Sequence, residues 1–177
     1  MLKRIPIPKT PLDRYLADIH YAVNAGALYS ALALSLAIPD ICGSIEYPGE
    51  SQVHRRYGDW FDAWCFLHQS QMSAADCYAM RCSYLHSGSA EFAGPSAGYA
   101  DLSHIQFTTG LSGGGWTSTF LPIGAPNTMP AVRIPVETFC RDMTTCANGW
   151  QVARTGDPRV AQALAQLLEI RPVGASS

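Results

Sequence analysis

Residues 73–88 read SAADCYAMRCSYLHSG, and this stretch decides the fold that the sequence predicts. Ser73 is a favourable N-cap because its hydroxyl can accept a hydrogen bond from an amide of the first turn. Gly88 is a favourable C-cap because glycine readily adopts the left-handed conformation that ends many helices. Between them, apolar residues recur at helical spacing: Ala75, Tyr78, Ala79, Cys82 and Leu85. The stretch therefore predicts a helix that packs one face against a helical core.

The same stretch carries an arginine and a histidine, Arg81 and His86, separated by four residues. Five positions on a regular helix rotate a side chain by about 140°, so the two would not share a face. They converge on one ligand only if the last turn unwinds or a second chain supplies the other half. Arginine holds phosphate through two parallel hydrogen bonds and histidine moves protons near neutral pH, so the pair suits phosphate chemistry. The alternative is a surface arginine and a terminal histidine that only complements the helix dipole.

Further helices are predicted upstream and downstream of this stretch. Residues 1–11 are rich in proline and form an extended arm. Residues 25–38 are almost wholly apolar and are typical of the central buried helix of a bundle. Pro39 would kink or restart this helix, and residues 40–47 are expected to continue as helix.

The other predicted helices follow from apolar spacing and from prolines at helix starts: they span residues 12–23, 55–68, 135–152 and 158–168. The first of them starts at Thr10 or Pro11 and is followed by a break at residues 24–26, and the second carries an aromatic stripe that is expected in the core or at a dimer interface. Gly156-Asp157-Pro158 caps the last one, and the third has one apolar face made of Val136, Phe139, Cys140, Met143 and Ala147.

The second half has β-character in three short runs, at residues 104–109, 116–123 and 131–134. A glycine-rich run at residues 110–115 is read as a hairpin connection, because it lacks the ending of a phosphate loop. We therefore predict a single domain over residues 1–177 that is mainly α. It would be a bundle of four to six helices with a small β-hairpin insertion at residues 104–134 and a flexible tail at residues 170–177.

Asp40 directly follows Pro39 at the end of the apolar stretch and has two alternative roles. It would cap a helix that restarts after the proline. Alternatively, its carboxylate would orient Arg81 or His86.

Several ordered strings in the first half resemble a known family. They are ALALSLAIPDICGSIE at residues 31–46, Trp60-Phe61, Asp76-Cys77-Tyr78, and Arg81-Cys82-x3-His86-x-Gly88. Together they resemble the HEPN superfamily of helical proteins, with its Arg-x4–6-His motif, and in particular a plasmid- and bacterium-borne subfamily. The resemblance covers residues 12–90.

The resemblance implies a HEPN-like bundle and metal-independent cleavage of RNA. His86 would act as general base on a ribose 2′-hydroxyl or as acid to the leaving group, and Arg81 would stabilise the pentacoordinate phosphate. The product would carry a 2′,3′-cyclic phosphate. The family usually builds this site across a homodimer. Arg81 of one chain and His86 of the other would then meet, although a rotation of about 140° separates them within one helix. The supporting residues would be Asp40, Asp76 and Tyr84.

Two other functions compete with the ribonuclease, whose role would be that of a toxin or a defence protein. Many active family members carry a polar residue after the arginine, often asparagine, where this chain has Cys82. One alternative is therefore a non-catalytic scaffold that binds RNA, a nucleotide or a partner protein. The other is a structural or regulatory protein in which Arg81 and His86 only complete a helix end. An antitoxin or regulatory protein is a further candidate partner.

Charge is sparse and slightly negative, with a formal net charge of −2 at pH 7. This argues against an overall basic coat, so any contact with RNA would be local. His54, Arg55 and Arg56 form a small basic cluster at a predicted helix start, where cations are unfavourable. Arg55 and Arg56 are therefore weak candidates for phosphate binding, and solvated surface is the alternative.

The chain has six cysteines and none forms a Cys-x-x-Cys pair. Without a recognisable secretory signal, they are typical of buried thiols in a reducing cytosol, so we expect a cytoplasmic protein. No histidine–cysteine spacing suits zinc, and we expect neither metal nor cofactor. Residues 25–38 are too short to span a bilayer, so no membrane association is expected.

Overall fold

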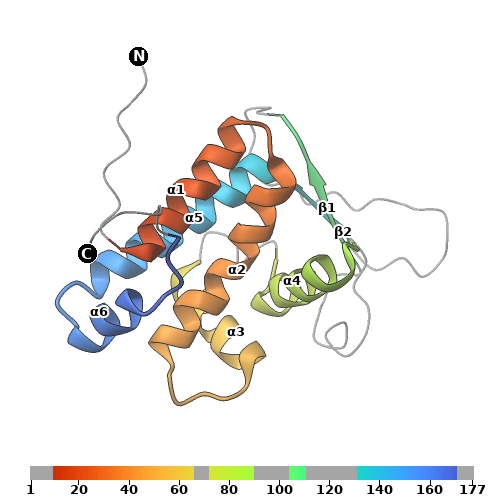
Figure 1. The fold of residues 1–177 in the computed structure, drawn as a ribbon. Coiled ribbons are helices and arrows are strands. Elements are labelled where there is room, and N and C mark those ends of the chain that lie inside the picture. The colour runs from red at the N-terminus through yellow and green to blue at the C-terminus, as the bar shows by residue number, and fades with distance from the viewer. Residues whose placement is uncertain (1–9, 66–71, 90–103, 111–130, 171–177) are drawn as a thin grey trace.

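The computed structural model describes residues 10–65, 72–89, 104–110 and 131–170. Within these ranges the chain forms six helices and a two-stranded sheet (Figure 1). The helices are α1 (Pro11–Asn24), α2 (Leu28–Glu46), α3 (Val53–Trp64), α4 (Ala74–Ser87), α5 (Val136–Ala153) and α6 (Pro158–Ala165). The strands are β1 (His104–Thr108) and β2 (Ala131–Pro135). The mainly helical fold is thus as the sequence predicts.

Helix α1 starts where the sequence predicts, at a cap that satisfies two amides at once. The Thr10 hydroxyl accepts a hydrogen bond from the Asp13 amide at 3.2 Å, and the Asp13 carboxylate accepts one from the Thr10 amide at 2.8 Å. Pro11 occupies the first helical position, where its missing N–H costs nothing. The predicted break after the helix is confirmed at Gly26, whose φ is +73°.

Helix α2 is the centre of the molecule and contacts each of the other five helices (Figure 1). The predicted central helix is therefore confirmed, and it continues through Pro39 to Glu46 as one helix rather than restarting after the proline. With 19 residues and a mean hydropathy of 1.5, α2 is by length and composition sufficient to cross a bilayer, a criterion that core helices of soluble proteins also meet. The expected absence of membrane association rests on the length of residues 25–38 alone, whereas the helix is longer, so this absence stays a prediction.

Helix α3 carries the predicted aromatic stripe into the core. Tyr57, Trp60 and Phe61 are fully buried, and the Trp60 ring packs edge-to-face on Trp150 of α5 at 6.5 Å between centroids. The helix begins at Val53 and ends at Trp64, whereas residues 55–68 were predicted. The end of that prediction lies outside the described residues.

Helix α4 has the predicted bounds but not the predicted face. Ser73 is the N-cap and Gly88 is the C-cap, with a φ of +67°. The buried side is centred on Cys77 and Met80, while Leu85 is 40 % exposed. Apolar residues surround much of this helix, so their spacing alone does not identify the side that meets the core.

Strands β1 and β2 correct the predicted hairpin, because they pair in parallel with His104 opposite Ala131 and Thr108 opposite Pro135. A hairpin joins antiparallel strands, whereas a parallel pair requires a crossover connection. The predicted runs at residues 104–109 and 131–134 are thus strands of one sheet. The predicted strand at residues 116–123 and most of the glycine-rich run lie outside the described residues.

Helix α5 follows β2 directly and lies beside α1 (Figure 1). Its predicted apolar face is confirmed as buried: Val136, Phe139, Cys140, Met143 and Ala147. Helix α6 starts at the predicted Asp157 cap and ends at Ala165, three residues short of the predicted end at Leu168. One buried core includes residues of all six helices and of both strands. The predicted arm at residues 1–11 lies outside the described ranges up to residue 9, and the tail at residues 170–177 lies outside them after residue 170.

Candidate functional site

The candidate functional residues of α4, Arg81 and His86, lie in its second half, and Arg81 points toward α2. The Arg81 guanidinium pairs with the Asp40 carboxylate at 2.6 Å, and the two side chains are only 23 % and 14 % exposed. Burial raises the pKa of the Asp40 carboxyl, and the positive charges of Arg81 and Arg56 act against this rise. Asp40 lies inside the continuous α2, so its alternative role as the cap of a restarted helix is wrong.

His86 lies in the last turn of α4 and is exposed. A rotation of about 140° separates it from Arg81 on a regular helix. Because Arg81 is turned to Asp40 while His86 is turned to solvent, the structure does not bring the two together within one chain. Gly88 ends the helix in a regular left-handed cap, so unwinding of the last turn does not unite the pair either.

Two of the predicted supporting residues serve the packing of α4. The Asp76 carboxylate is 2 % exposed and accepts hydrogen bonds from the Ser73 amide at 2.9 Å and hydroxyl at 2.7 Å. It therefore completes the N-terminal cap, a full turn before Arg81. The Tyr84 hydroxyl donates to the Tyr29 carbonyl at 3.1 Å, which ties the end of α4 to the start of α2.

The structure separates the two arginines at the start of α3. Arg55 is exposed, whereas Arg56 is half-buried and lies near enough to Asp40 to lower its pKa. The Arg56 carbonyl packs against Gly43, where an added Cβ would lie only 2.5 Å away. The sequence signal for this position is the unfavourable placement of cations at a helix start. That signal does not distinguish Arg55 from Arg56.

Within the described residues, we find neither a reactive thiol nor a set of metal ligands at this site. The six cysteines are free, five of them buried and Cys82 half-buried, and Arg81 approaches the Cys82 sulfur at 4.0 Å. Burial raises the pKa of Cys140 to about 11 and that of Cys77 to about 12, so both are thiols at neutral pH. Among the residues that the structure describes, no group of three or more His, Cys, Asp or Glu is arranged to hold a metal ion.

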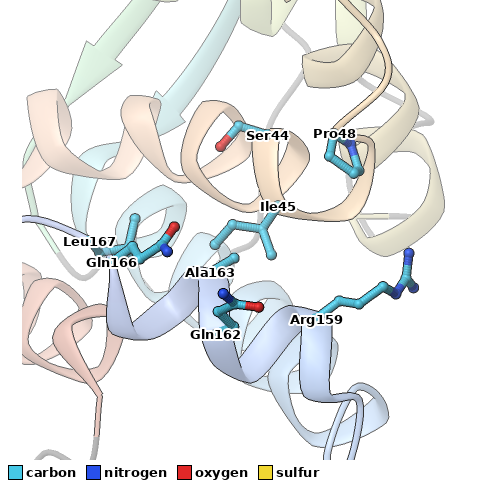
Figure 2. Close-up of a pocket in the computed structure, with 8 residues that line it drawn as sticks. All are labelled: Ser44, Ile45, Pro48, Arg159, Gln162, Ala163, Gln166 and Leu167. Carbon is cyan, nitrogen blue, oxygen red and sulfur yellow. The ribbon is translucent and has the colours of Figure 1, made fainter.

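A groove of about 490 Å³ lies away from these residues, between the end of α2 and α6 (Figure 2). Its charged residue, Arg159, pairs with Asp157 at 2.9 Å. None of the predicted site residues lines it; the lining residues are Ser44, Ile45, Pro48, Arg159, Gln162, Ala163, Gln166 and Leu167. The sequence gives no signal for this groove, because its walls come from segments more than a hundred residues apart. A smaller cavity of about 150 Å³ lies between α1 and α5.

The site that the geometry assembles therefore consists of Asp40, Arg56 and Arg81, with His86 on a neighbouring exposed surface of α4. It offers positive charge on a partly buried surface, which can hold an anion. Comparison of the chain with protein-family models, with curated proteins and with solved structures gave no match.

Proposed function

We propose that this chain is a HEPN-like, metal-independent endoribonuclease that is active as a homodimer. Arg81 of one subunit would hold the scissile phosphate, and the partner subunit's His86 would take the proton of the attacking 2′-hydroxyl. The hydroxyl oxygen would form the new bond to phosphorus, the bond from phosphorus to the 5′-oxygen would break, and the leaving 5′-oxygen would take a proton from water. The products would be a 2′,3′-cyclic phosphate and a 5′-hydroxyl.

The observation that carries the proposal is the ion pair of Arg81 with Asp40 at 2.6 Å. A carboxylate that holds the guanidinium in one orientation spares the ordering of a long side chain when phosphate binds. The proposal requires a second subunit because Arg81 and His86 diverge on α4. Apolar side chains near the end of α4 suit such contact, since Leu85 is 40 % and Tyr29 is 81 % exposed.

A non-catalytic scaffold that binds RNA, a nucleotide or a partner protein is the second candidate function. It is favoured by the same ion pair, because Asp40 already neutralises one positive charge beside the phosphate position. The two candidates differ in one respect that an assay can detect. The ribonuclease requires His86, whereas the scaffold does not.

The test is cleavage of single-stranded RNA in the presence of EDTA. Under the proposal, His86→Ala lowers the cleavage rate by about 10²–10⁴-fold, the range for one acid–base side chain. His20→Ala is the matched control, because His20 is also exposed on a helix but lies in α1. Intact RNA at every protein ratio with a folded dimer would exclude the ribonuclease and leave the scaffold.

Mixing of two inactive variants tests whether the site is shared between subunits. In a heterodimer of Arg81→Ala with His86→Ala, one composite site has lost both groups and the other retains both. Activity should therefore reappear on mixing. A site built within one chain would stay inactive in every combination, because each site would lack one group.

A further inference from the structure

Arg56 and Arg81 share a single carboxylate where α2, α3 and α4 meet. Arg81 pairs with Asp40 at 2.6 Å, and the Arg56 charge acts on the same carboxyl. Asp40 pairs directly with Arg81, and the charge of Arg56 adds to the positive charge at the same place. Because Asp40 is only 14 % exposed, water screens these charges poorly.

Both guanidinium groups also have an unused donor. The Nε atoms of Arg56 and Arg81 are buried, and within the described part of the chain neither has a hydrogen-bond partner. Leaving a buried donor unpaired is unfavourable, and such groups are few in native proteins. Two such donors near a carboxylate that already pairs with Arg81 indicate a site where a bound anion would supply the missing hydrogen-bond acceptors.

The start of α3 adds to the positive charge at this place. Its first turn contains no acidic residue, and the Gln52 cap gives no side-chain hydrogen bond. Helix starts carry a partial positive charge, so cations there are destabilising unless an anion compensates them. His54 is half-buried in the same turn, with its ring 6.2 Å from that of Tyr78 on α4.

We propose that Arg56 and Arg81 together bind one phosphodiester of single-stranded RNA, with Asp40 as the residue that positions both guanidinium groups. Arg56 is thus a phosphate-binding residue outside the Arg-x4–6-His motif, and the exposed Arg55 is not. The identity of the ligand rests on the proposed function, whereas the two-arginine anion site does not.

The first experiment uses the unmodified chain and inorganic phosphate. Nuclear magnetic resonance of the isotope-labelled protein follows the Nε–H signals of Arg56 and Arg81 during the titration. Both signals should shift with phosphate and stay unchanged with chloride at equal ionic strength. Absence of a phosphate-specific shift would overturn the site. Because this titration uses the unmodified chain, it tests the site even if the variant Arg56→Gln, used in the second experiment, does not fold.

The second experiment measures the affinity for a short fluorescent 2′-O-methyl oligouridylate, which attack by a 2′-hydroxyl cannot cut. Arg56→Gln should weaken binding at least about tenfold, as expected for loss of a charged hydrogen bond. It should also make the log–log salt slope shallower by roughly 0.7. Arg55→Gln, the matched control on the neighbouring residue, should change the affinity much less.

The outcomes separate this proposal from the ribonuclease. Equal weakening by Arg55→Gln and Arg56→Gln would mean diffuse attraction and would overturn the site. Phosphate-induced shifts without oligonucleotide binding would overturn the assignment to RNA. Selective weakening by Arg56→Gln supports the site even where no RNA is cleaved, because the probe reports binding alone.

Discussion

Arg81 and Asp40 depend on each other because their ion pair lies mostly out of solvent, with side chains 23 % and 14 % exposed. Removing one partner leaves the other charge partly buried without compensation, and this costs more than an exposed pair contributes. The sequence alone places Arg81 near a helix end, where truncation would cost at most about 1 kcal/mol of dipole energy. The ion pair raises the expected stability cost of truncating Arg81.

We expect Arg81→Ala to lower the free energy of unfolding by roughly 1–3 kcal/mol, the cost of leaving a buried polar group unpaired. Urea denaturation measures this quantity. Arg141→Ala is the matched control on α5, because the Arg141 side chain is 63 % exposed and pairs with its neighbour Asp142. A surface change of this kind stays within about 0.5 kcal/mol. Equal stability of the two variants would show that the Asp40 pair has no energetic role in the fold.

Glu46 forms a second charged contact, which ties the end of α2 to the end of α5. Its carboxylate accepts hydrogen bonds from Arg154 Nε and from Trp150 Nε1, both at 2.9 Å. Arg154 also lies over the Trp64 ring, 5.4 Å from the centroid. The hydrogen bond from Arg154, followed by that from Trp150, lowers the pKa of Glu46 below its ordinary 4.5 despite partial burial.

This pKa shift predicts a pH dependence with a defined sign. Because the folded protein holds the Glu46 proton more weakly than the unfolded chain, the contribution of Glu46 to stability is fully present above pH 4.5 and is lost as the pH falls through the folded pKa. The stability difference between the wild type and Glu46→Gln should therefore shrink on acidification, as urea titrations at several pH values would show.

Two comparisons isolate this effect. Burial raises the pKa of Asp40, so Asp40 acts with the opposite sign, but it is present in both proteins and cancels in the difference. Glu50→Gln is the matched control, because the Glu50 carboxylate accepts an exposed hydrogen bond from the Gln52 amide. A Glu46 difference that is constant from acid to neutral pH would contradict the assigned contact.

At the scale of elements, the close contact between α2 and α3 depends on a residue without a side chain. A Cβ on Gly43 would lie 2.5 Å from the Arg56 carbonyl oxygen, a backbone atom that cannot rotate away. Gly43→Ala should therefore destabilise the protein by roughly 1–3 kcal/mol, as overpacking does. It should also move Arg56 relative to Asp40.

Gly149 supplies the control for this prediction, because it lies in α5 with nothing within 4 Å of an added Cβ. Gly149→Ala should stabilise the protein by up to about 1 kcal/mol through helix propensity alone. Thermal unfolding of the two variants should thus shift in opposite directions. Stabilisation by Gly43→Ala would show that α2 and α3 lie farther apart than described.

The elements differ in how well their sequences determine them. Caps are local, so Ser73, Gly88 and Asp157 locate helix ends from the sequence. The connection and the packing decide that β1 and β2 pair in parallel. Neither can be read from the sequence of a five-residue strand. The buried side of α4 was unpredictable for a similar reason, since apolar residues surround much of that helix.

The candidate site was predictable in composition but not in geometry. Arg81, Arg56 and Asp40 are each conspicuous in the sequence, as charges at a helix end, at a helix start and after a proline. Their contact depends on how α2, α3 and α4 cross, which is a tertiary property. Whether α2 continues through Pro39 or restarts after it could not be decided from the sequence either, because proline usually ends a helix and packing overrides that tendency here.

At the scale of the whole molecule, we expect a homodimer that uses the end of α4. Light scattering at micromolar concentration should give twice the mass of the chain. Leu85→Glu should shift the protein to a monomer, because Leu85 is exposed beside His86. Val152→Glu is the control, since Val152 is 75 % exposed on α5. A wild-type monomer would contradict both the dimer and the shared active site.

The net charge of −2 limits how the whole molecule binds RNA. Each phosphate neutralised on a single strand contributes roughly −0.7 to the log–log salt slope, so a slope shallower than about −4 is expected. Binding of a non-cleavable oligonucleotide at several salt concentrations measures this slope. A much steeper value would mean that assembly creates a broad basic surface.

The central position of α2 has a consequence for where the chain can be cut. The family resemblance stops near residue 90, but α2 packs against α5 and α6 as well as against the helices before that point. A fragment truncated after Ser89 would expose the side of α2 that packs against α5 and α6 in the intact chain. Such a fragment should aggregate or stay unfolded rather than behave as a minimal domain. The Arg81–His86 pair and the second half would then be inherited together or lost together.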